Sequence, residues 1–197
     1  MALRRIGLYG GAFNPPHVGH LVVAELMREA FALEAVWWIP THEPPHKDNQ
    51  SLAAPEHRLA MVEAAIAGHE GFAVSRVELD RSGPSFTYDT VMHLQRTHPD
   101  VAFQLILGGD SLRAFMRWHR PLDIVSRVPL LVYRRPGDDL ERADLPQAVR
   151  TRIHLVEAPY LEVSSTDLRA RVARQATIRY LVPEAVRHYI QAHHLYR

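Results

Sequence analysis

Short, continuous apolar runs alternate along the chain with longer segments whose apolar residues recur at helical spacing. Apolar runs of this length without in–out alternation are typical of strands that are covered on both faces. They predict six strands, at residues 3–9, 35–39, 72–79, 102–107, 129–133 and 153–156.

Helices are predicted between these strands and at the C-terminal end. Residues 18–31 are apolar on most faces, which predicts a helix covered on several sides. Residues 56–67 form a helix that stops at a glycine, and residues 87–97 form a third helix. Two more finish the chain, one beginning near Ser164 and the other at Pro183.

The alternation of strands and helices predicts the fold class. A parallel sheet covered on two faces is the arrangement that buries such strands, so we expect a Rossmann-like, doubly wound α/β fold. Residues 1–197 are predicted to form a single domain, with a small C-terminal helical part at about 164–197. Residues 40–55, which include four prolines, and the polar residues 137–152 are predicted to be surface loops.

The composition argues against several kinds of partner and site. With 23 Lys and Arg against 22 Asp and Glu, the net charge of +1 gives no reason to expect binding to nucleic acid or to an anionic membrane. The absence of cysteine excludes disulfides, thiolate metal sites and a cysteine nucleophile. No stretch approaches a membrane span of roughly 18 apolar residues, and no secretory leader is evident. We expect a cytoplasmic protein, and the sequence leaves its oligomeric state open.

A glycine- and histidine-rich motif, GGAFNPPHVGH at residues 10–20, follows the first predicted strand. Gly10 and Gly11 allow the backbone to approach a bound group closely. His17 and His20 then lie on one face near a helix N-terminus, where the dipole and the N–H groups attract anions. Two other interpretations are histidines that simply face solvent or core, and a zinc pair. Helical zinc pairs are more usually spaced i, i+4, and no third ligand is evident nearby.

A second motif, VSSTDLR, lies at residues 163–169. Ser164 and Ser165 precede a predicted helix, where serine is a favoured N-cap. Arg169 lies about one turn inside that helix and can reach back toward the same end. Taken alone, the motif indicates only a capped helix with a surface arginine.

The first motif resembles the signature of the nucleotidylyltransferase superfamily, and VSSTDLR resembles the superfamily's second signature. Ala12 departs from the pattern, which usually has Thr or Ser, so no phosphate contact is assigned to it. The resemblance implies that His20 and His17 are catalytic. It assigns ATP binding to Gly10, Gly11, Phe13, Gly108, Asp110, Ser164, Ser165 and Arg169. Class I aminoacyl-tRNA synthetases share the HxGH element, but their KMSKS element is absent from this chain.

Three further stretches resemble the nicotinate-mononucleotide adenylyltransferases in particular. They are PPHK at 44–47, GPSFTYDT at 83–90, and LGGDSL at 107–112 followed by Trp118. The resemblance implies that the first two stretches and Trp118 contribute to acceptor binding, while Gly108 and Asp110 of the third belong to the ATP site. The acceptor-binding residues would be His46, Lys47, Thr87, Trp118 and Arg135.

Each of these acceptor residues has its own implied role. His46 and Lys47 would grip the acceptor phosphate, Thr87 would meet the nicotinate carboxylate, and Trp118 would stack on the pyridine ring. Asp110 suits a ribose hydroxyl, and the contribution of Arg135 is the least specific. On local grounds Thr87 is equally a helix N-cap, and Trp118 equally an ordinary packing residue.

The resemblance implies adenylyl transfer from ATP to nicotinate mononucleotide, giving nicotinate adenine dinucleotide and pyrophosphate. Mg²⁺ would enter with ATP, with no metal site on the protein. The alternatives are another phosphate acceptor (nicotinamide mononucleotide or phosphopantetheine), a non-catalytic nucleotide sensor, and a metal-binding protein on the same fold.

Overall fold

The core of the molecule is one parallel sheet. The computed structural model describes residues 3–43, 52–134 and 144–197. Six strands pair in the order β3-β2-β1-β4-β5-β6, and every pair is parallel. Their bounds are β1 Arg4–Gly11, β2 Ala35–Pro40, β3 Phe72–Val74, β4 Val101–Gly108, β5 Leu130–Arg134 and β6 Ile153–Glu157. The order 3-2-1-4-5-6 is that of the Rossmann fold, so the predicted fold class is confirmed.

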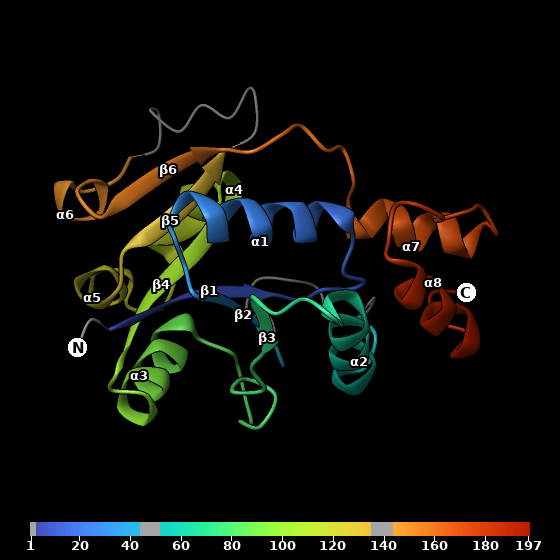
Figure 1. Cartoon of the computed structure of the whole chain (residues 1–197), viewed down its shortest axis with the longest axis horizontal. Helices are drawn as coiled ribbons and strands as arrows, with labels where there is room; N and C mark the ends of the chain where they lie inside the picture. The colour runs from blue at the N-terminus through green and yellow to red at the C-terminus, as the bar shows by residue number, and fades with distance from the viewer. Residues whose placement is uncertain (1–2, 44–51, 135–143) are drawn as a thin grey trace.

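Helices cover both faces of this sheet, and α1 and α3 lie on opposite sides of it (Figure 1). The longer helices are α1 Val18–Ala30, α2 Pro55–Ile66, α3 Thr87–Thr97, α7 Ser165–Ala173 and α8 Glu184–Ala192. The shorter ones are α4 Gly109–Ala114, α5 Pro121–Arg127, α6 Gln147–Arg150 and the 3₁₀ helix η2 Phe115–Arg117.

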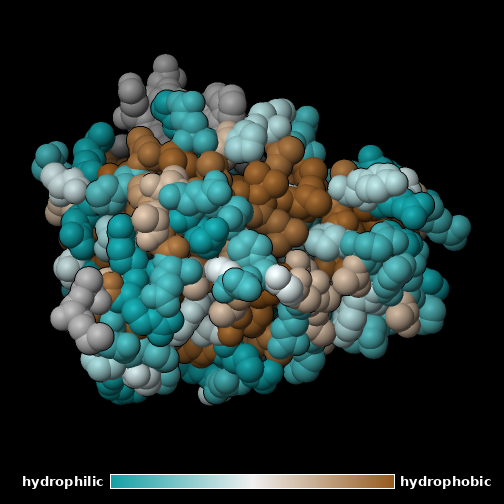
Figure 2. All heavy atoms as spheres, viewed as in Figure 1, coloured by the Kyte–Doolittle hydropathy of each residue, from teal (hydrophilic) through white to brown (hydrophobic). Residues whose placement is uncertain are grey.

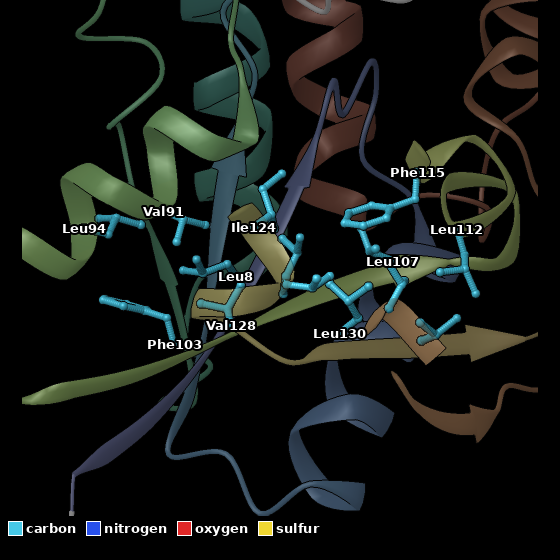
Figure 3. Packing of buried hydrophobic residues seen from close by; sticks show 14 of the residues in the cluster. Leu8, Val91, Leu94, Phe103, Leu107, Leu112, Phe115, Ile124, Val128 and Leu130 are labelled. Atoms are coloured by element: carbon cyan, nitrogen blue, oxygen red, sulfur yellow. The ribbon is translucent and has the colours of Figure 1, made fainter. Parts of the chain in front are cut away.

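Alternate strand residues build two separate cores. On one face, Leu105 and Leu107 of β4 and Leu130 of β5 pack with residues of α3, α4 and α5 (Figure 3). On the other face, Ile106 and Leu131 pack with residues of α1 and α2. Because successive side chains of a strand point to opposite faces, the continuous apolar runs are what a sheet covered on both sides requires.

The structure corrects the prediction for the third strand. Residues 72–79 were expected to form it, but β3 ends at Val74. β3 is the edge strand, and its register with β2 ends where Trp38 pairs with Val74. The chain then turns, with the Asp80 N–H donating to the Arg76 carbonyl at 2.9 Å.

The helices between β4 and β6 were not predicted. α4, α5 and α6 have 6, 7 and 4 residues, too few to show a clear helical period in the sequence. The Gly108–Gly109 pair was interpreted as the end of a strand, but Gly109 is the first residue of α4.

Helix α1 is covered less completely than its sequence predicts. Only Val23, Ala24 and Met27 of this helix are buried. Val22 is 37% exposed, and apolar atoms gather at the surface over the position of α1 (Figure 2).

The C-terminal helices have an apolar cluster of their own. Leu168 of α7 and Val186 and Ile190 of α8 pack with Met61 of α2. Both helices lie at one end of the molecule, with α7 beside the N-terminal end of α1 (Figure 1). The division of the chain into one domain with a helical part from about residue 164 stays a prediction.

We predict that Leu130→Ala lowers the free energy of unfolding by about 2–5 kcal/mol, because it leaves a cavity in a fully buried site. Urea denaturation followed by circular dichroism measures the loss. Leu155→Ala on the neighbouring strand β6 is the control, since Leu155 is 51% exposed, and we expect a change within about 0.5 kcal/mol. Equal losses in the two variants would contradict the assigned core.

Candidate active site

A cleft of about 750 Å³ opens at the carboxyl ends of β1 and β4. The chain leaves β1 toward β2 on one side of the sheet and later crosses to β4 on the other, so this is the switch point where ligands bind in such sheets. Twelve of the predicted site residues line the cleft: Gly10, Gly11, Phe13, His17, His20, Thr87, Gly108, Asp110, Trp118, Ser164, Ser165 and Arg169. The other three, His46, Lys47 and Arg135, lie outside the described residues.

The two histidines of the first motif stack on one another where α1 begins. Their ring centroids are 3.7 Å apart and the rings are inclined by 29°. His17 is the N-cap residue, and its N–H donates to Nδ1 of His20 at 3.1 Å. Because Nδ1 of His20 accepts this bond, the neutral ring carries its proton on Nε2. His20 thus lines the cleft with an N–H donor on its ring.

Gly19 and Phe13 have structural reasons to be present. A Cβ on Gly19 would lie 3.1 Å from Nδ1 of His17, so a larger residue would press on the stacked pair. The Phe13 side chain is 3% exposed and packs against Tyr9 and Trp38. The Phe13 ring therefore has a packing role beside the cleft.

The second motif meets the first in space. Ser164 is the N-cap of α7, and its hydroxyl accepts from the Asp167 N–H at 3.1 Å. The Ser165 hydroxyl donates to the Pro15 carbonyl at 2.9 Å. The Arg169 guanidinium donates to the Asn14 carbonyl at 3.0 Å. Two motifs about 150 residues apart in sequence thus share one wall of the cleft.

Three other predicted residues line the opposite part of the cleft. Thr87 is the first residue of α3, whose N-cap is Phe86, so the interpretation of Thr87 as the N-cap is wrong. Trp118 is partly buried and lies 5.4 Å from the ring of Phe115, so it packs while still lining the cleft. Asp110 is exposed in the first turn of α4 and pairs with Arg113.

Glu78, which the sequence analysis did not single out, is a buried carboxylate in the cleft wall. It is 6% exposed and accepts from the Thr90 hydroxyl at 2.8 Å. Burial raises the pKa of Glu78, and the bonds from Thr90, Ser85 and Thr41 oppose that shift. Since Ser85 belongs to the GPSFT motif, Glu78 holds a stretch expected to bind the acceptor. The predicted strand at 72–79 included Glu78, and this concealed its role, because β3 ends at Val74.

Arg58 was also missed, although it is the only arginine among the largest fully buried side chains of the described part of the chain. Its guanidinium donates to the carbonyls of Ala12, Thr41, His42 and Ala53. A signal was present in the sequence. Arg58 precedes Met61 and Val62 by three and four residues, which puts it on the buried face of α2.

Within residues 3–43, 52–134 and 144–197, no three His, Asp or Glu side chains are grouped as ligands for a metal ion. Over the same residues, no helix has the length and apolar character needed to cross a membrane.

The chain is similar to a known protein family and to several named proteins. The cytidylyltransferase-like family model matches residues 8–171. A probable nicotinate-nucleotide adenylyltransferase of Salinibacter ruber is 54% identical over 98% of this chain and 97% of its own length. A protein of the same name from Geobacillus thermodenitrificans is 42% identical over 98% and 86%. The chain belongs to the nicotinate-nucleotide adenylyltransferase family. The resemblance drawn from the sequence motifs is therefore confirmed.

Solved structures of the family share the fold. The nicotinic acid mononucleotide adenylyltransferase of Plasmodium falciparum complexed with NaAD superposes with a TM-score of 0.79 at 20% identity, covering 98% of this chain and 97% of that one. A structure from Vibrio parahaemolyticus, described as a putative nicotinate-nucleotide adenylyltransferase, gives a TM-score of 0.73 at 20% identity, covering 99% and 96%. At such identities the likeness concerns the fold alone.

The raised pKa of Glu78 makes stability depend on pH. The folded carboxyl keeps its proton to higher pH than the unfolded one. Above the ordinary glutamate pKa of about 4.5, the folded state therefore binds more protons than the unfolded state does at the same pH. The free energy of unfolding contributed by Glu78 therefore falls as the pH rises through that window. Glu78→Gln removes this loss, and we predict that its melting temperature, relative to the unmodified protein, increases from pH 4.5 toward pH 8.

Melting curves recorded by circular dichroism across this pH range test the prediction. Glu70→Gln is the matched control, because Glu70 is exposed outside the cleft. A Glu78→Gln difference as flat with pH as that of the control would show that burial does not shift this carboxyl.

Proposed function

We propose that this protein transfers the adenylyl group of ATP to nicotinate mononucleotide, producing nicotinate adenine dinucleotide and pyrophosphate. One observation carries the proposal. The N-terminus of α1, with its stacked histidines, and the N-terminus of α7 meet at a single loop at the end of β1, in a member of the nicotinate-nucleotide adenylyltransferase family. Two helix N-termini directed at one cleft form a site for a polyphosphate.

The reaction needs little covalent help from the protein. The phosphate of the acceptor is already anionic at neutral pH, and one of its oxygens attacks the α-phosphorus of ATP. A new phosphorus–oxygen bond forms as the bond to the bridging oxygen of pyrophosphate breaks in line. Alignment and charge stabilisation therefore supply the catalysis. ATP enters as its Mg²⁺ complex, which neutralises part of the charge on the phosphates.

The two histidines act at the α-phosphate of ATP and at the phosphates next to it. His20 presents its Nε2–H to the α-phosphate, where negative charge builds up in the transition state. His17 lies directly beside it and contacts the neighbouring ATP phosphates. Because the cap bond and the stacking fix the ring of His20, little rearrangement is needed when the charge develops.

The N-terminal end of α7 takes the leaving group. Ser164, Ser165 and Arg169 hold the β- and γ-phosphates. A guanidinium carries five N–H donors, so Arg169 can bind phosphate oxygens while it retains its bond to Asn14. The positive end of the α7 dipole favours the same anion.

The acceptor occupies the side of the cleft lined by α3 and Trp118. Thr87 and nearby N–H groups meet the nicotinate carboxylate, and Trp118 stacks on the pyridine ring. Asp110, which lines the same cleft, is assigned to ATP, where it accepts from a ribose hydroxyl. His46 and Lys47 hold the acceptor phosphate. Donors placed for a carboxylate are poorly satisfied by a carboxamide, which selects nicotinate over nicotinamide.

We place the reaction in the cytoplasm, since a chain without cysteine suits a reducing compartment. Arg135 contributes to the acceptor side. Transfer to nicotinamide mononucleotide or phosphopantetheine, and nucleotide sensing without turnover, are the outcomes that an assay with several acceptors separates.

Replacing His20 tests the proposed chemistry. We predict that His20→Ala lowers kcat by roughly two to four orders of magnitude, the scale for losing one preorganised donor. Pyrophosphate release from ATP and nicotinate mononucleotide measures it. His20→Asn separates catalysis from folding, because its amide oxygen can still accept the His17 N–H.

The control is His188→Ala, which removes an exposed imidazole on α8 and leaves kcat unchanged. If kcat fell less than tenfold in both folded His20 variants, the proposed contact of His20 with the α-phosphate would be wrong.

A further inference from the structure

Arg58 of α2 is a buried cation with an unusual set of partners. The residue is 1% exposed, yet no carboxylate of residues 3–43, 52–134 or 144–197 forms an ion pair with it. Backbone carbonyls surround the guanidinium instead. Nε donates to Ala53 at 3.0 Å, Nη1 donates to Ala12 at 3.1 Å and to Thr41 at 2.6 Å, and Nη2 donates to His42 at 3.1 Å.

These four carbonyls belong to three separate segments of the cleft wall. Ala12 follows β1 and lies in the loop that carries the first motif. Thr41 and His42 follow β2, and Ala53 lies just before α2. The guanidinium therefore joins the ends of two neighbouring strands to the start of a helix, directly behind residues that line the cleft.

The chemistry of the side chain explains why arginine is needed at this point. A planar guanidinium offers five N–H donors in a fixed fork, so it can bind several diverging carbonyls at once. Burial lowers the pKa of Arg58, and arginine still keeps its charge in a protein. Hydrogen bonds from a cation are stronger than neutral ones, and carbonyls left buried without a donor are costly.

We propose that Arg58 is a positioning residue that fixes the ATP-side loop at Ala12 against the acceptor-side segment at Thr41–His42 and the start of α2 at Ala53, so that the two reacting phosphates lie in line. The inference rests on the proposed adenylyl transfer. Arg58 itself touches neither substrate and acts through the backbone that it binds.

The two sides of the cleft depend on Arg58 unequally. Two of its four bonds hold the carbonyls of Thr41 and His42, in the segment whose His42 N–H donates to the Ser85 hydroxyl of the acceptor-side GPSFT stretch. A third bond reaches Ala53, whose own N–H donates to Oδ1 of Asn14 in the ATP-side loop. Without Arg58 the ATP-side loop keeps three of these bonds, since Arg169 and Ser165 bind the carbonyls of Asn14 and Pro15 and the Ala53 N–H binds the Asn14 side chain. Thr41 and His42 keep their N–H bonds to Gly11 and Ser85, but their carbonyls lose the guanidinium. Loss of the guanidinium should therefore disturb acceptor binding and alignment more than ATP binding.

Kinetics of two variants test this imbalance. Arg58→Lys keeps the charge but not the fork, and Arg58→Met keeps most of the length without charge. For both we expect kcat with nicotinate mononucleotide to fall about 10- to 100-fold, the scale for a misplaced reactive geometry. The KM for the acceptor should rise at least about fivefold and the KM for ATP less than about twofold, following the division of the bonds.

The matched control is Arg152→Met. Arg152 also binds a backbone carbonyl, that of Val125 at 3.1 Å, but it precedes β6 at the opposite end of the sheet from the cleft. We expect its kinetic constants to stay within twofold of those of the unmodified protein. A loss of folded protein alone would lower kcat without shifting one KM against the other, so the split identifies positioning.

Hydrogen exchange supplies a readout that does not depend on activity. In the Arg58 variants, measured under conditions where circular dichroism shows them folded, amides near Ala12, Thr41 and Ala53 should exchange at least about tenfold faster, and those of β5 should not. Unchanged exchange, or folded variants with kcat and both KM values within threefold of the unmodified protein, would overturn the inference. If the unmodified protein releases no pyrophosphate, the proposed function fails, and the exchange result still decides whether Arg58 joins these segments.

Discussion

The site depends on how the backbone carbonyls of residues 12–15 are satisfied after β1 ends. A strand that leaves its sheet loses its ladder partners, and buried carbonyls without donors are costly. Here side chains from two helices supply the donors: Arg58 of α2 binds Ala12, while Arg169 and Ser165 of α7 bind Asn14 and Pro15. The Asn14 side chain in turn accepts from the Tyr196 hydroxyl at 2.7 Å. One loop thereby fixes the sheet, α2, α7 and the C-terminal end relative to one another.

The bonds to this loop also determine where the proposed catalytic residues lie. The loop leads directly into α1, so its fixed path sets where the stacked His17 and His20 begin that helix. The same bonds bring the N-terminus of α7 to the cleft, although its Leu168 packs in a separate C-terminal cluster. Stability and function are joined in these contacts, because a side chain that binds the loop also decides where a phosphate can lie.

The sheet and the two motifs could be predicted from the sequence, because each is encoded in a local pattern. The continuous apolar runs predicted the parallel sheet, and the two motifs predicted that 10–20 and 163–169 serve one site. Prediction from the sequence failed where long-range context decides the structure. β3 stops early because its pairing with β2 ends, and no local feature of residues 75–79 indicates this. The bonds of Arg58 to four distant carbonyls depend on tertiary contact, even though its helical position placed it on a buried face.

A competition assay shows directly whether this cleft adenylylates a nicotinate-bearing acceptor. The protein would be incubated with ATP, Mg²⁺ and equal concentrations of nicotinate and nicotinamide mononucleotides, and the dinucleotide products separated and quantified by chromatography. We expect nicotinate adenine dinucleotide to exceed nicotinamide adenine dinucleotide by at least about tenfold, because the acceptor side is expected to place donors at a carboxylate. Equal amounts of the two dinucleotides, or neither, would contradict this expectation.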